Sequence, residues 1–420
     1  MHNFTIPEVA ATSGTEHETI FLHMERPDET SMRDSPGHSV LDYRHFGAFR
    51  LLLASLVLLQ HYLANLAPSQ LAERMQANEI GSVAVLIFFC LSGFVISEAA
   101  DRIYQNRPGA FLTNRALRIV PHFVLAVGMS ILIHYVFSKA GTLRIARVDV
   151  SFSQAAFAPT NIFLNLFSFA PIAHRSLSYN FLDIAWAIRV EMVFYLAIAA
   201  SLVLVLLIRG HSDVRFETAA LIALLTLVPP FALTFAGRAP AMLQFLPYFA
   251  YGSALYFWAA RRAPLALGFA AGALLVMIWR FLSQPGHHPE FGFERAVGTE
   301  FLELALLLSI MSGLAFKRLK RLRAADRFCG DLTYPLYLYH QNIMILALSL
   351  TSGYSNTVFA ATIIAAFVAA YALHRLVDPL VDRARDRVRG RKLASRSRSM
   401  PMAPLGLGAG HERETRSARA

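Results

Sequence analysis

The chain contains repeated runs of about twenty apolar residues, separated by polar connections. An α-helix rises about 1.5 Å per residue, so each run is long enough to cross the roughly 30 Å hydrocarbon core of a bilayer. The composition agrees, because 55% of the 420 residues are hydrophobic and only 16% are charged, whereas soluble domains carry about 25% charged residues. The runs predict an all-α fold, a polytopic membrane helical bundle of about ten transmembrane helices.

The predicted spans are Phe46–Leu66, Gly81–Ala99, Ile119–Phe137, Phe181–Ile208, Glu217–Phe235, Pro240–Ala260, Pro264–Leu282, Val297–Phe316, Asp331–Leu350 and Val358–Val377. Pro121 is expected in the first turn of the third helix, where a proline is tolerated. Residues 138–178 form a long connection, in which the apolar segment Asn161–Ala170 is expected to lie in the membrane interface or to re-enter the membrane.

The charged residues gather at the two ends of the chain. Residues 1–38 hold seven acidic and two basic residues, and residues 382–420 hold eleven basic and four acidic residues. We interpret both segments as disordered tails, the second lying against anionic membrane lipids. They flank one membrane domain, residues 39–381. A basic tail beside a membrane span, without a folded domain of its own, does not favour binding to nucleic acid.

The connections also predict an orientation. With both termini in the cytoplasm, most lysine and arginine residues of the short connections lie on the inner side, as the positive-inside rule requires. The N-terminus lacks the pattern of a cleavable signal, so the first span is expected to act as an uncleaved anchor. Neither a disulfide nor a metal site is predicted from Cys90 and Cys329, and the polar loop with His287, His288 and Glu290 has no recognisable ligand spacing.

Polar residues inside the first span are the strongest functional signal. Arg50 and His61 lie eleven residues apart, which places them on nearly the same face of a helix and roughly 16 Å apart along its axis. Because such side chains are costly to bury in lipid, they are expected to face protein, water or a substrate. The alternative is that Arg50 lies among the headgroups and His61 pairs with another helix.

Other spans carry similar residues. Arg115 and Arg118 share a helix face at the inner membrane surface, where two guanidinium groups can hold phosphates or simply anchor the helix. Glu191 lies well inside the fourth span, as a functional carboxylate, as part of an internal ion pair with the nearby Arg189, or as a neutral buried acid. His340 lies in the ninth span, where a buried histidine can be structural or functional.

Five segments, in order, are FRLLLASLVLLQH, FFCLSGFVIS, NRALRIVP, WAIRVEMVFY and LTYPLYLYH. Together they resemble the acyltransferase 3 family over about residues 42–380. The resemblance implies an integral-membrane O-acyltransferase of the bacterial cytoplasmic membrane that modifies surface polysaccharides, glycans or small molecules. Departures from the family pattern are Gly47 in place of an aspartate, Ala187 and Thr333 in place of serines, and Asp378 in place of a glutamate.

The expected donor is an acyl-CoA, most often acetyl-CoA in this family, with its phosphates bound by Arg115 and Arg118 and with Arg50 near its pantetheine or diphosphate. A histidine titrates near neutral pH, so His61 is the predicted general base that takes the proton of the acceptor hydroxyl. Glu191 would orient His61 or hold the acceptor. The residues expected to line the acceptor side are Trp186, Tyr195, Tyr337 and His340.

Two other classes of protein also contain buried arginine, histidine and glutamate in many spans. One is a secondary transporter, although such proteins often show internal repeats that this sequence lacks. The other is an export protein or flippase for a lipid-linked glycan, without acyl chemistry. Within the enzyme interpretation the sequence leaves open a carbohydrate, a lipid-linked glycan or a small molecule as acceptor, and a separate extracytoplasmic protein as the one that completes the transfer.

Overall fold

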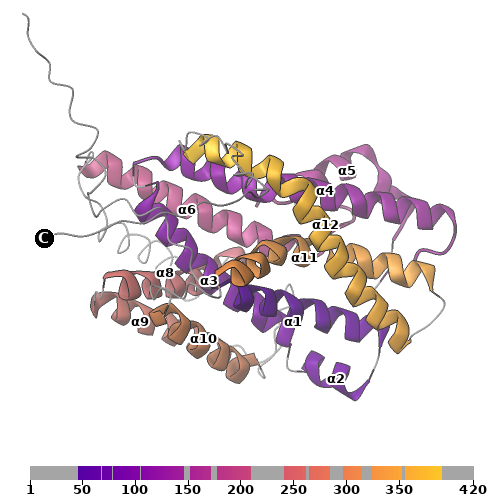
Figure 1. Cartoon of the computed structure of the whole chain (residues 1–420), viewed down its shortest axis with the longest axis horizontal. Coiled ribbons are helices and arrows are strands. Elements are labelled where there is room, and N and C mark those ends of the chain that lie inside the picture. The colour runs from indigo at the N-terminus through magenta and orange to yellow at the C-terminus, as the bar shows by residue number, and fades with distance from the viewer. Residues whose placement is uncertain are drawn as a thin grey trace, which may run out of the picture. The chain divides into compact units, whose positions relative to one another are not determined.

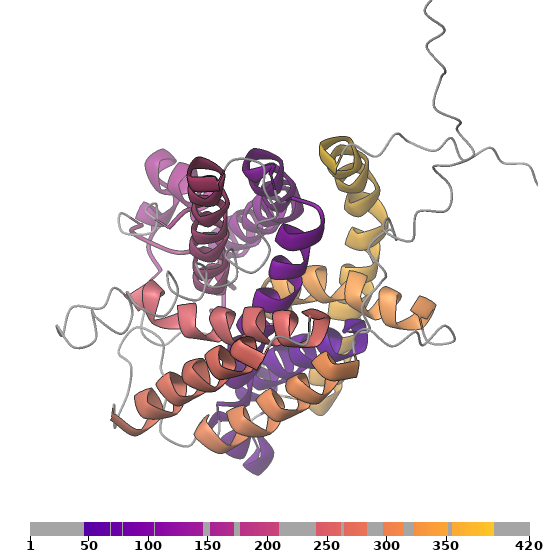
Figure 2. The same ribbon diagram turned by 90° about the vertical axis from the view of Figure 1, so that its left-hand side faces the viewer.

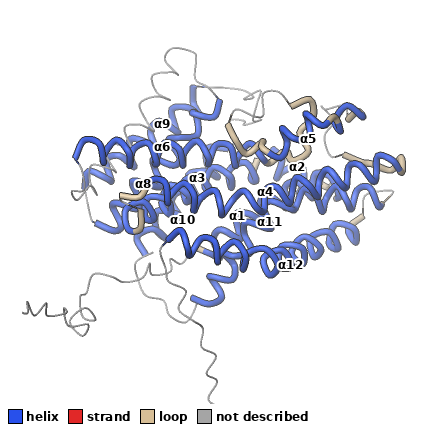
Figure 3. The backbone as a smooth tube through the Cα atoms, turned by 90° about the horizontal axis from the view of Figure 1, so that it is seen from above, coloured by secondary structure: helices blue, strands red, loops and turns tan. Residues whose placement is uncertain are grey.

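The computed structural model describes residues 46–67, 69–77, 79–104, 106–145, 152–171, 177–209, 241–261, 264–283, 297–314, 323–351 and 355–389. These residues form helices and their connections, and none of them belongs to a β-strand (Figures 1 and 3). The prediction of an all-α fold is therefore confirmed for the described part of the chain.

The helices are α1 Gly47–Leu66, α2 Gln70–Ala77, α3 Ile80–Arg102, α4 Pro108–Lys139, α5 Pro159–Leu166, α6 Ala185–Arg209, α8 Leu246–Arg261, α9 Pro264–Ser283, α10 Val297–Leu314, α11 Arg323–Leu350 and α12 Asn356–Arg389, with 3-10 turns η1 Gln154–Phe157 and η3 Ala241–Phe245. Every predicted span overlaps a described helix except 217–235, which lies outside the described residues. Helices α1, α3, α4, α6 and α12 are long and apolar enough to cross a membrane. The chain is a membrane protein, and the total of about ten spans stays a prediction.

Helix α3 lies at the centre of the helix packing. In its apolar stretch 72% of the residues are buried, compared with 17% in α12. Helices α1, α8 and α10 all pack against α3, and Figure 2 shows α8, α9 and α10 grouped together. Because α3 is apolar on every side, it is stable only when other helices surround it. Helix α12 instead exposes a stripe of large apolar side chains that suits contact with lipid, including Ile364 and Val368.

Glycine residues allow α3 and α8 to come unusually close. A Cβ atom added to Gly252 of α8 would overlap the carbonyl oxygen of Cys90 in α3. One added to Gly93 of α3 would overlap the carbonyl oxygen of Phe249 in α8. The two backbones are therefore in direct contact, as is common between membrane helices with small residues at their interface.

Helix α4 begins earlier than predicted. It starts at Pro108 rather than at residue 119, so Pro121 lies inside the helix and not in its first turn. A proline in a helix interior removes a backbone hydrogen bond, and side chains of α11 add hydrogen bonds to α4 carbonyls on either side of Pro121. Donors from α11 reach three of them: Tyr334 to Ile119 (3.1 Å), Tyr339 to His122 (3.0 Å) and Asn342 to Ala126 (2.9 Å). Contacts with α11 thus stabilise this proline-containing helix.

The apolar segment predicted over residues 161–170 forms the short helix α5. Two buried asparagines on successive turns of it, Asn161 and Asn165, bind the backbone of residues 178–181. Both amides donate to the carbonyl of Tyr179, at 3.1 and 2.9 Å. They fix the chain just before it enters α6, and thereby the position at which α6 starts.

The contact between α3 and α8 predicts that Gly252→Ala lowers the melting temperature of the detergent-purified protein. The new methyl group forces the helices apart, at a cost of roughly 1–3 kcal/mol. Gly268→Ala in α9 is the matched control, because nothing lies within 4 Å of its added Cβ atom. Equal melting temperatures for the two variants would contradict the close contact.

Candidate functional site

A cavity lies among α1, α3, α4, α6 and α11, with an empty volume of about 630 Å³ including its open mouth. All five helices contribute polar side chains to it: Arg50, Ser92, Arg118, Glu191, Tyr195, Thr333, Tyr334 and Tyr337. The other lining residues are apolar: Val85, Phe88, Phe89, Ile119, Ala187 and Ile188. Charged groups between such apolar walls interact more strongly than they would in water.

Glu191 is the carboxylate of this cavity. Its Oε1 atom accepts a short hydrogen bond from the hydroxyl of Tyr195, one turn along α6, and a second bond of 3.3 Å from Ser92 of α3. Its Oε2 atom makes no hydrogen bond to the described residues. One oxygen is thus held in place by two hydroxyl groups, and the other is available to a bound molecule.

The predicted pairing of Glu191 with Arg189 is absent from the structure. The side chain of Arg189 is buried on another face of α6, where it donates a hydrogen bond of 3.2 Å to the carbonyl of Ser168. Glu191 and Arg189 are two residues apart, and positions two apart on a helix do not face each other. Glu191 is therefore not explained as half of that ion pair.

The arginines of the predicted donor site take different positions. Arg50 and Arg118 line the cavity, whereas Arg115 is buried beside it. The guanidinium group of Arg115 lies over the rings of Phe111 and Tyr195, 5.6 and 5.9 Å from their centroids. Such cation–π contacts partly compensate for the water that a buried guanidinium group has lost.

His61 and His340 form a stacked pair, with 5.4 Å between their ring centroids. The Nδ1 atom of His340 lies 2.7 Å from the carbonyl oxygen of Tyr337. Since a carbonyl only accepts hydrogen bonds, this nitrogen carries the proton, and Nε2 of the neutral ring is a free acceptor. That Nε2 atom is buried and has no hydrogen-bond partner among the described residues.

Neither histidine lines the cavity. Tyr337 connects the cavity with the histidine pair. Its side chain lines the cavity, while its carbonyl oxygen accepts a hydrogen bond from His340 one turn further along α11. Along the same face of α1, Arg50 lines the cavity, Val57 is buried, and His61 is exposed. His61 therefore lies on the same side of α1 as Arg50, eleven residues further along, and there its ring stacks on His340 of α11.

Trp186 and Tyr195 were both expected on the acceptor side. Tyr195 lines the cavity, but Trp186 lies behind its wall, with its ring 6.0 Å from that of Phe89 and 5.5 Å from that of Phe245. Ala187 and Thr333, the departures from the serines of the family pattern, both line the cavity. Ala187 removes a hydroxyl group from the wall, whereas Thr333 keeps the hydroxyl and adds a methyl group.

A family model and a known protein both match most of this chain. The model of an acyltransferase domain, acyltransferase 3, matches residues 45–375. The chain belongs to the acyltransferase 3 family. It is also 27% identical over 308 residues to the exopolysaccharide production protein ExoZ of Rhizobium meliloti (strain 1021), which covers 72% of this chain and 90% of ExoZ. No solved structure matches the chain.

The protein is therefore a membrane-embedded acyltransferase, and the transporter and flippase interpretations are set aside. Within its described residues, no group of three histidine, cysteine, aspartate or glutamate side chains is arranged to hold a metal ion. The loop with His287, His288 and Glu290 lies outside the described residues.

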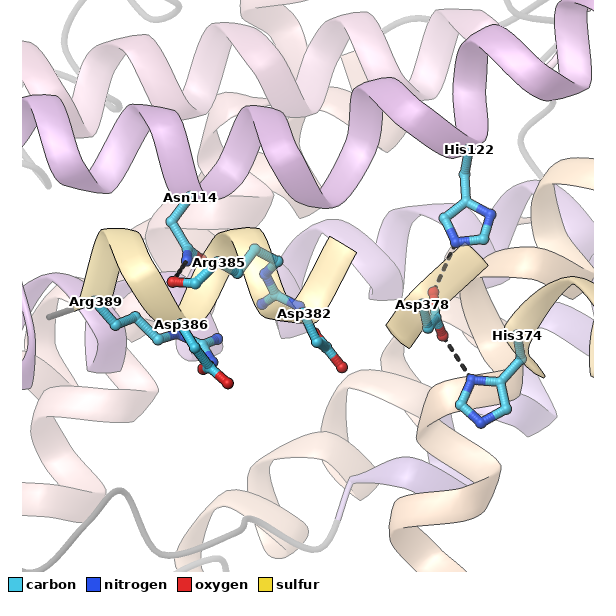
Figure 4. Close-up of polar contacts among 8 residues, drawn as sticks. All are labelled: Asn114, His122, His374, Asp378, Asp382, Arg385, Asp386 and Arg389. Atoms are coloured by element: carbon cyan, nitrogen blue, oxygen red, sulfur yellow. Dashed lines mark hydrogen bonds and ion pairs between the residues drawn. The ribbon is translucent and has the colours of Figure 1, made fainter. Parts of the chain in front are cut away.

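The acyltransferase has a polar contact between α4 and α12 that the sequence did not reveal. Asp378 accepts a hydrogen bond at each oxygen, from His122 of α4 at 2.7 Å and from His374 of its own helix at 2.6 Å (Figure 4). His122 lies one turn after Arg118, so this contact fixes the part of α4 that lines the cavity. The four-residue spacing of His374 and Asp378 is a sequence signal for the contact within α12, but not for the contact with His122.

Helix α12 also continues to Arg389, eight residues beyond the predicted end of the membrane domain at 381. The expectation of a disordered tail from residue 382 is wrong for residues 382–389. Two ion pairs stabilise this last part of the helix, Arg385 with Asp382 at 2.9 Å and Arg389 with Asp386 at 3.2 Å.

The position of Asp378 predicts that Asp378→Ala destabilises the acyltransferase. The buried Nε2–H group of His122 would lose its acceptor, at a cost of about 1–3 kcal/mol. Asp386→Ala is the control, because a solvent-accessible ion pair is worth at most about 1 kcal/mol. Thermal unfolding in detergent should show a clearly larger loss for Asp378→Ala; losses of equal size would show that the contact with His122 adds no stability.

Proposed function

We propose that this acyltransferase moves an acyl group, acetyl in the first instance, from cytoplasmic acyl-CoA to a hydroxyl group of a polysaccharide or related carbohydrate. The observation that carries the proposal is a cavity inside an apolar bundle that combines two arginines with a carboxylate. The acceptor class is supported by the likeness to a protein named for exopolysaccharide production.

The arginine end of the cavity suits the phosphates of acyl-CoA. Arg118 and Arg50 line it and Arg115 lies beside it, so cationic groups gather around one space. Guanidinium groups bind phosphate through paired, charge-assisted hydrogen bonds. Arg118 belongs to the predicted inner end of its span, so the donor enters from the cytoplasm, with both chain termini on that side.

The proposed general base, His61, lies outside the cavity, beyond Tyr337. In the proposed reaction a nitrogen of His61 takes the proton of the acceptor hydroxyl, whose oxygen forms a bond to the thioester carbonyl carbon. The carbon–sulfur bond then breaks, and the leaving CoA thiolate takes the proton from the His61 imidazolium. His340 holds the ring of His61 by stacking, and the exposed edge of His61 gives an acceptor from the outer side access to it.

Tyr337 lies between the cavity and the pair formed by His61 and His340. Its side chain lines the cavity on one side, and its carbonyl oxygen fixes His340 on the other. In the proposed arrangement the thioester end of the donor passes this ring to reach His61. Glu191, whose Oε2 atom makes no hydrogen bond to the described residues, holds the donor arm or the acceptor through hydrogen bonds.

The role of His61 predicts that His61→Ala lowers kcat for acetyl transfer by about 10²–10⁴-fold, the usual contribution of a general base. The binding of acetyl-CoA should change little, because His61 lies away from the arginines. The control is Asn65→Ala, one turn further along α1, whose side chain donates only to the His61 carbonyl. Wild-type kcat in His61→Ala would exclude His61 as the base.

The donor site predicts that Arg118→Gln raises KM for acetyl-CoA about tenfold or more, since a charge-assisted hydrogen bond is worth about 1.5–3 kcal/mol. Arg375→Gln, an exposed arginine of α12, is the charge-matched control. Cells that lack the protein should also lose base-labile acyl esters from their surface polysaccharide. An unchanged ester content would contradict the proposed acceptor.

A further inference from the structure

The last three turns of α12 are attached to the beginning of α4. The guanidinium group of Arg107 donates to the carbonyl oxygens of Val388 (2.9 Å) and Arg389 (3.4 Å). Four residues before Arg389, the amide of Asn114 donates to the carbonyl of Arg385 at 3.3 Å (Figure 4). This end of the helix is therefore fixed against α4, and its side chains have defined positions.

The attachment brings arginines of α12 to those of α4. The backbone of Arg385 is hydrogen-bonded to Asn114, the residue before Arg115, and its charge is repelled by those of Arg118, Arg389 and Arg115. The carboxylates of Asp382 and Asp386 pair with the two arginines of α12. Since Arg118 lines the cavity, Arg385 extends the positive charge of the cavity toward the cytoplasmic end of the bundle. We name these four arginines, 115, 118, 385 and 389, the arginine cluster.

The hydrogen-bonding capacity of the arginine cluster exceeds what its neighbours use. A guanidinium group has five N–H donors. The Nε atoms of Arg115, Arg385 and Arg389 are buried and have no hydrogen-bond partner among the described residues. The carboxylates that pair with the α12 arginines lie toward solvent, with 59% of the Asp382 side chain and 33% of the Asp386 side chain exposed. The inner side of the cluster thus combines positive charge with unused donors.

Neighbouring like charges destabilise a fold unless an anion joins them, and guanidinium groups are well matched by phosphate. The structure therefore assigns a ligand class to the cluster, a molecule with several phosphate groups. We propose that Arg385, with Arg389, extends the donor site, so that the end of α12 binds phosphates of the nucleotide portion of acyl-CoA together with Arg115 and Arg118. This inference rests on the proposed function, since that function supplies the donor.

The experiment measures CoA binding by calorimetry to the full-length protein in nanodiscs of zwitterionic phosphatidylcholine. Arg385→Gln should weaken CoA binding about tenfold or more, the loss of one charge-assisted hydrogen bond. Arg387→Gln, an exposed arginine of the same helix, should bind CoA as the wild type does. Asp382→Asn breaks the same ion pair as Arg385→Gln but removes a negative charge, so it should bind CoA as tightly or more tightly.

The opposite effects of the two variants separate a ligand-binding role from a structural one. Equal weakening by Arg385→Gln and Asp382→Asn would show that only the ion pair matters and would overturn the inference. So would wild-type affinity in Arg385→Gln, which leaves the proposed function intact. A wild-type protein that binds no CoA would overturn the proposed donor and the inference together.

Anionic lipid headgroups are the other source of phosphate. The same variants are therefore measured in nanodiscs that contain phosphatidylglycerol. If Arg385→Gln lowers CoA affinity as much in zwitterionic nanodiscs as in those with phosphatidylglycerol, the ligand of the arginine cluster is the donor. If Arg385→Gln changes the stability of the protein only when phosphatidylglycerol is present, and leaves CoA affinity unchanged in both, the cluster binds lipid and the inference is wrong.

Discussion

A polar group inside an apolar helical bundle must find another polar group, because lipid and apolar side chains offer it nothing to replace water. Among the described residues, several polar groups satisfy that requirement through contacts between helices. Hydroxyl and amide groups of α11 bind carbonyls of α4, and Asp378 joins two histidines from α4 and α12. These contacts set the relative positions of the helices around the cavity.

Some of the proposed site residues meet this requirement only in part. Oε2 of Glu191 has no partner among the described residues, and the same holds for Nε2 of His340 and for Nε of Arg115. Unused acceptors and donors in an apolar environment are costly for stability. Their presence at both ends of one set of helices fits a site that is completed by its substrates.

The proposed donor and base positions are separate in the structure. Arg50 and Arg118 line the cavity, whereas the stacked pair of His61 and His340 lies outside it and is joined to it through Tyr337. In the proposed reaction the donor has to extend from the cavity to this pair. The close packing of α3 against α8, through Gly93 and Gly252, supplies the rigid wall behind the cavity.

The sequence by itself determined the membrane class, the helical fold and the family, because the length of an apolar run and the order of short motifs are local properties. It also selected Arg50, Arg118, Glu191, Tyr195 and Tyr337, which the structure places around one cavity. Tertiary structure alone decided that Trp186 lies behind the cavity wall, that Asp378 joins α4 to α12, and that the last turns of α12 bring Arg385 to Arg118. The last two of these contacts join residues more than 250 positions apart, as His122 and Asp378 are, and all of them depend on how each helix is rotated and where it ends. The length of a hydrophobic run constrains neither the rotation of a helix about its axis nor the residue at which the helix ends, since lipid accepts an apolar helix in any rotation.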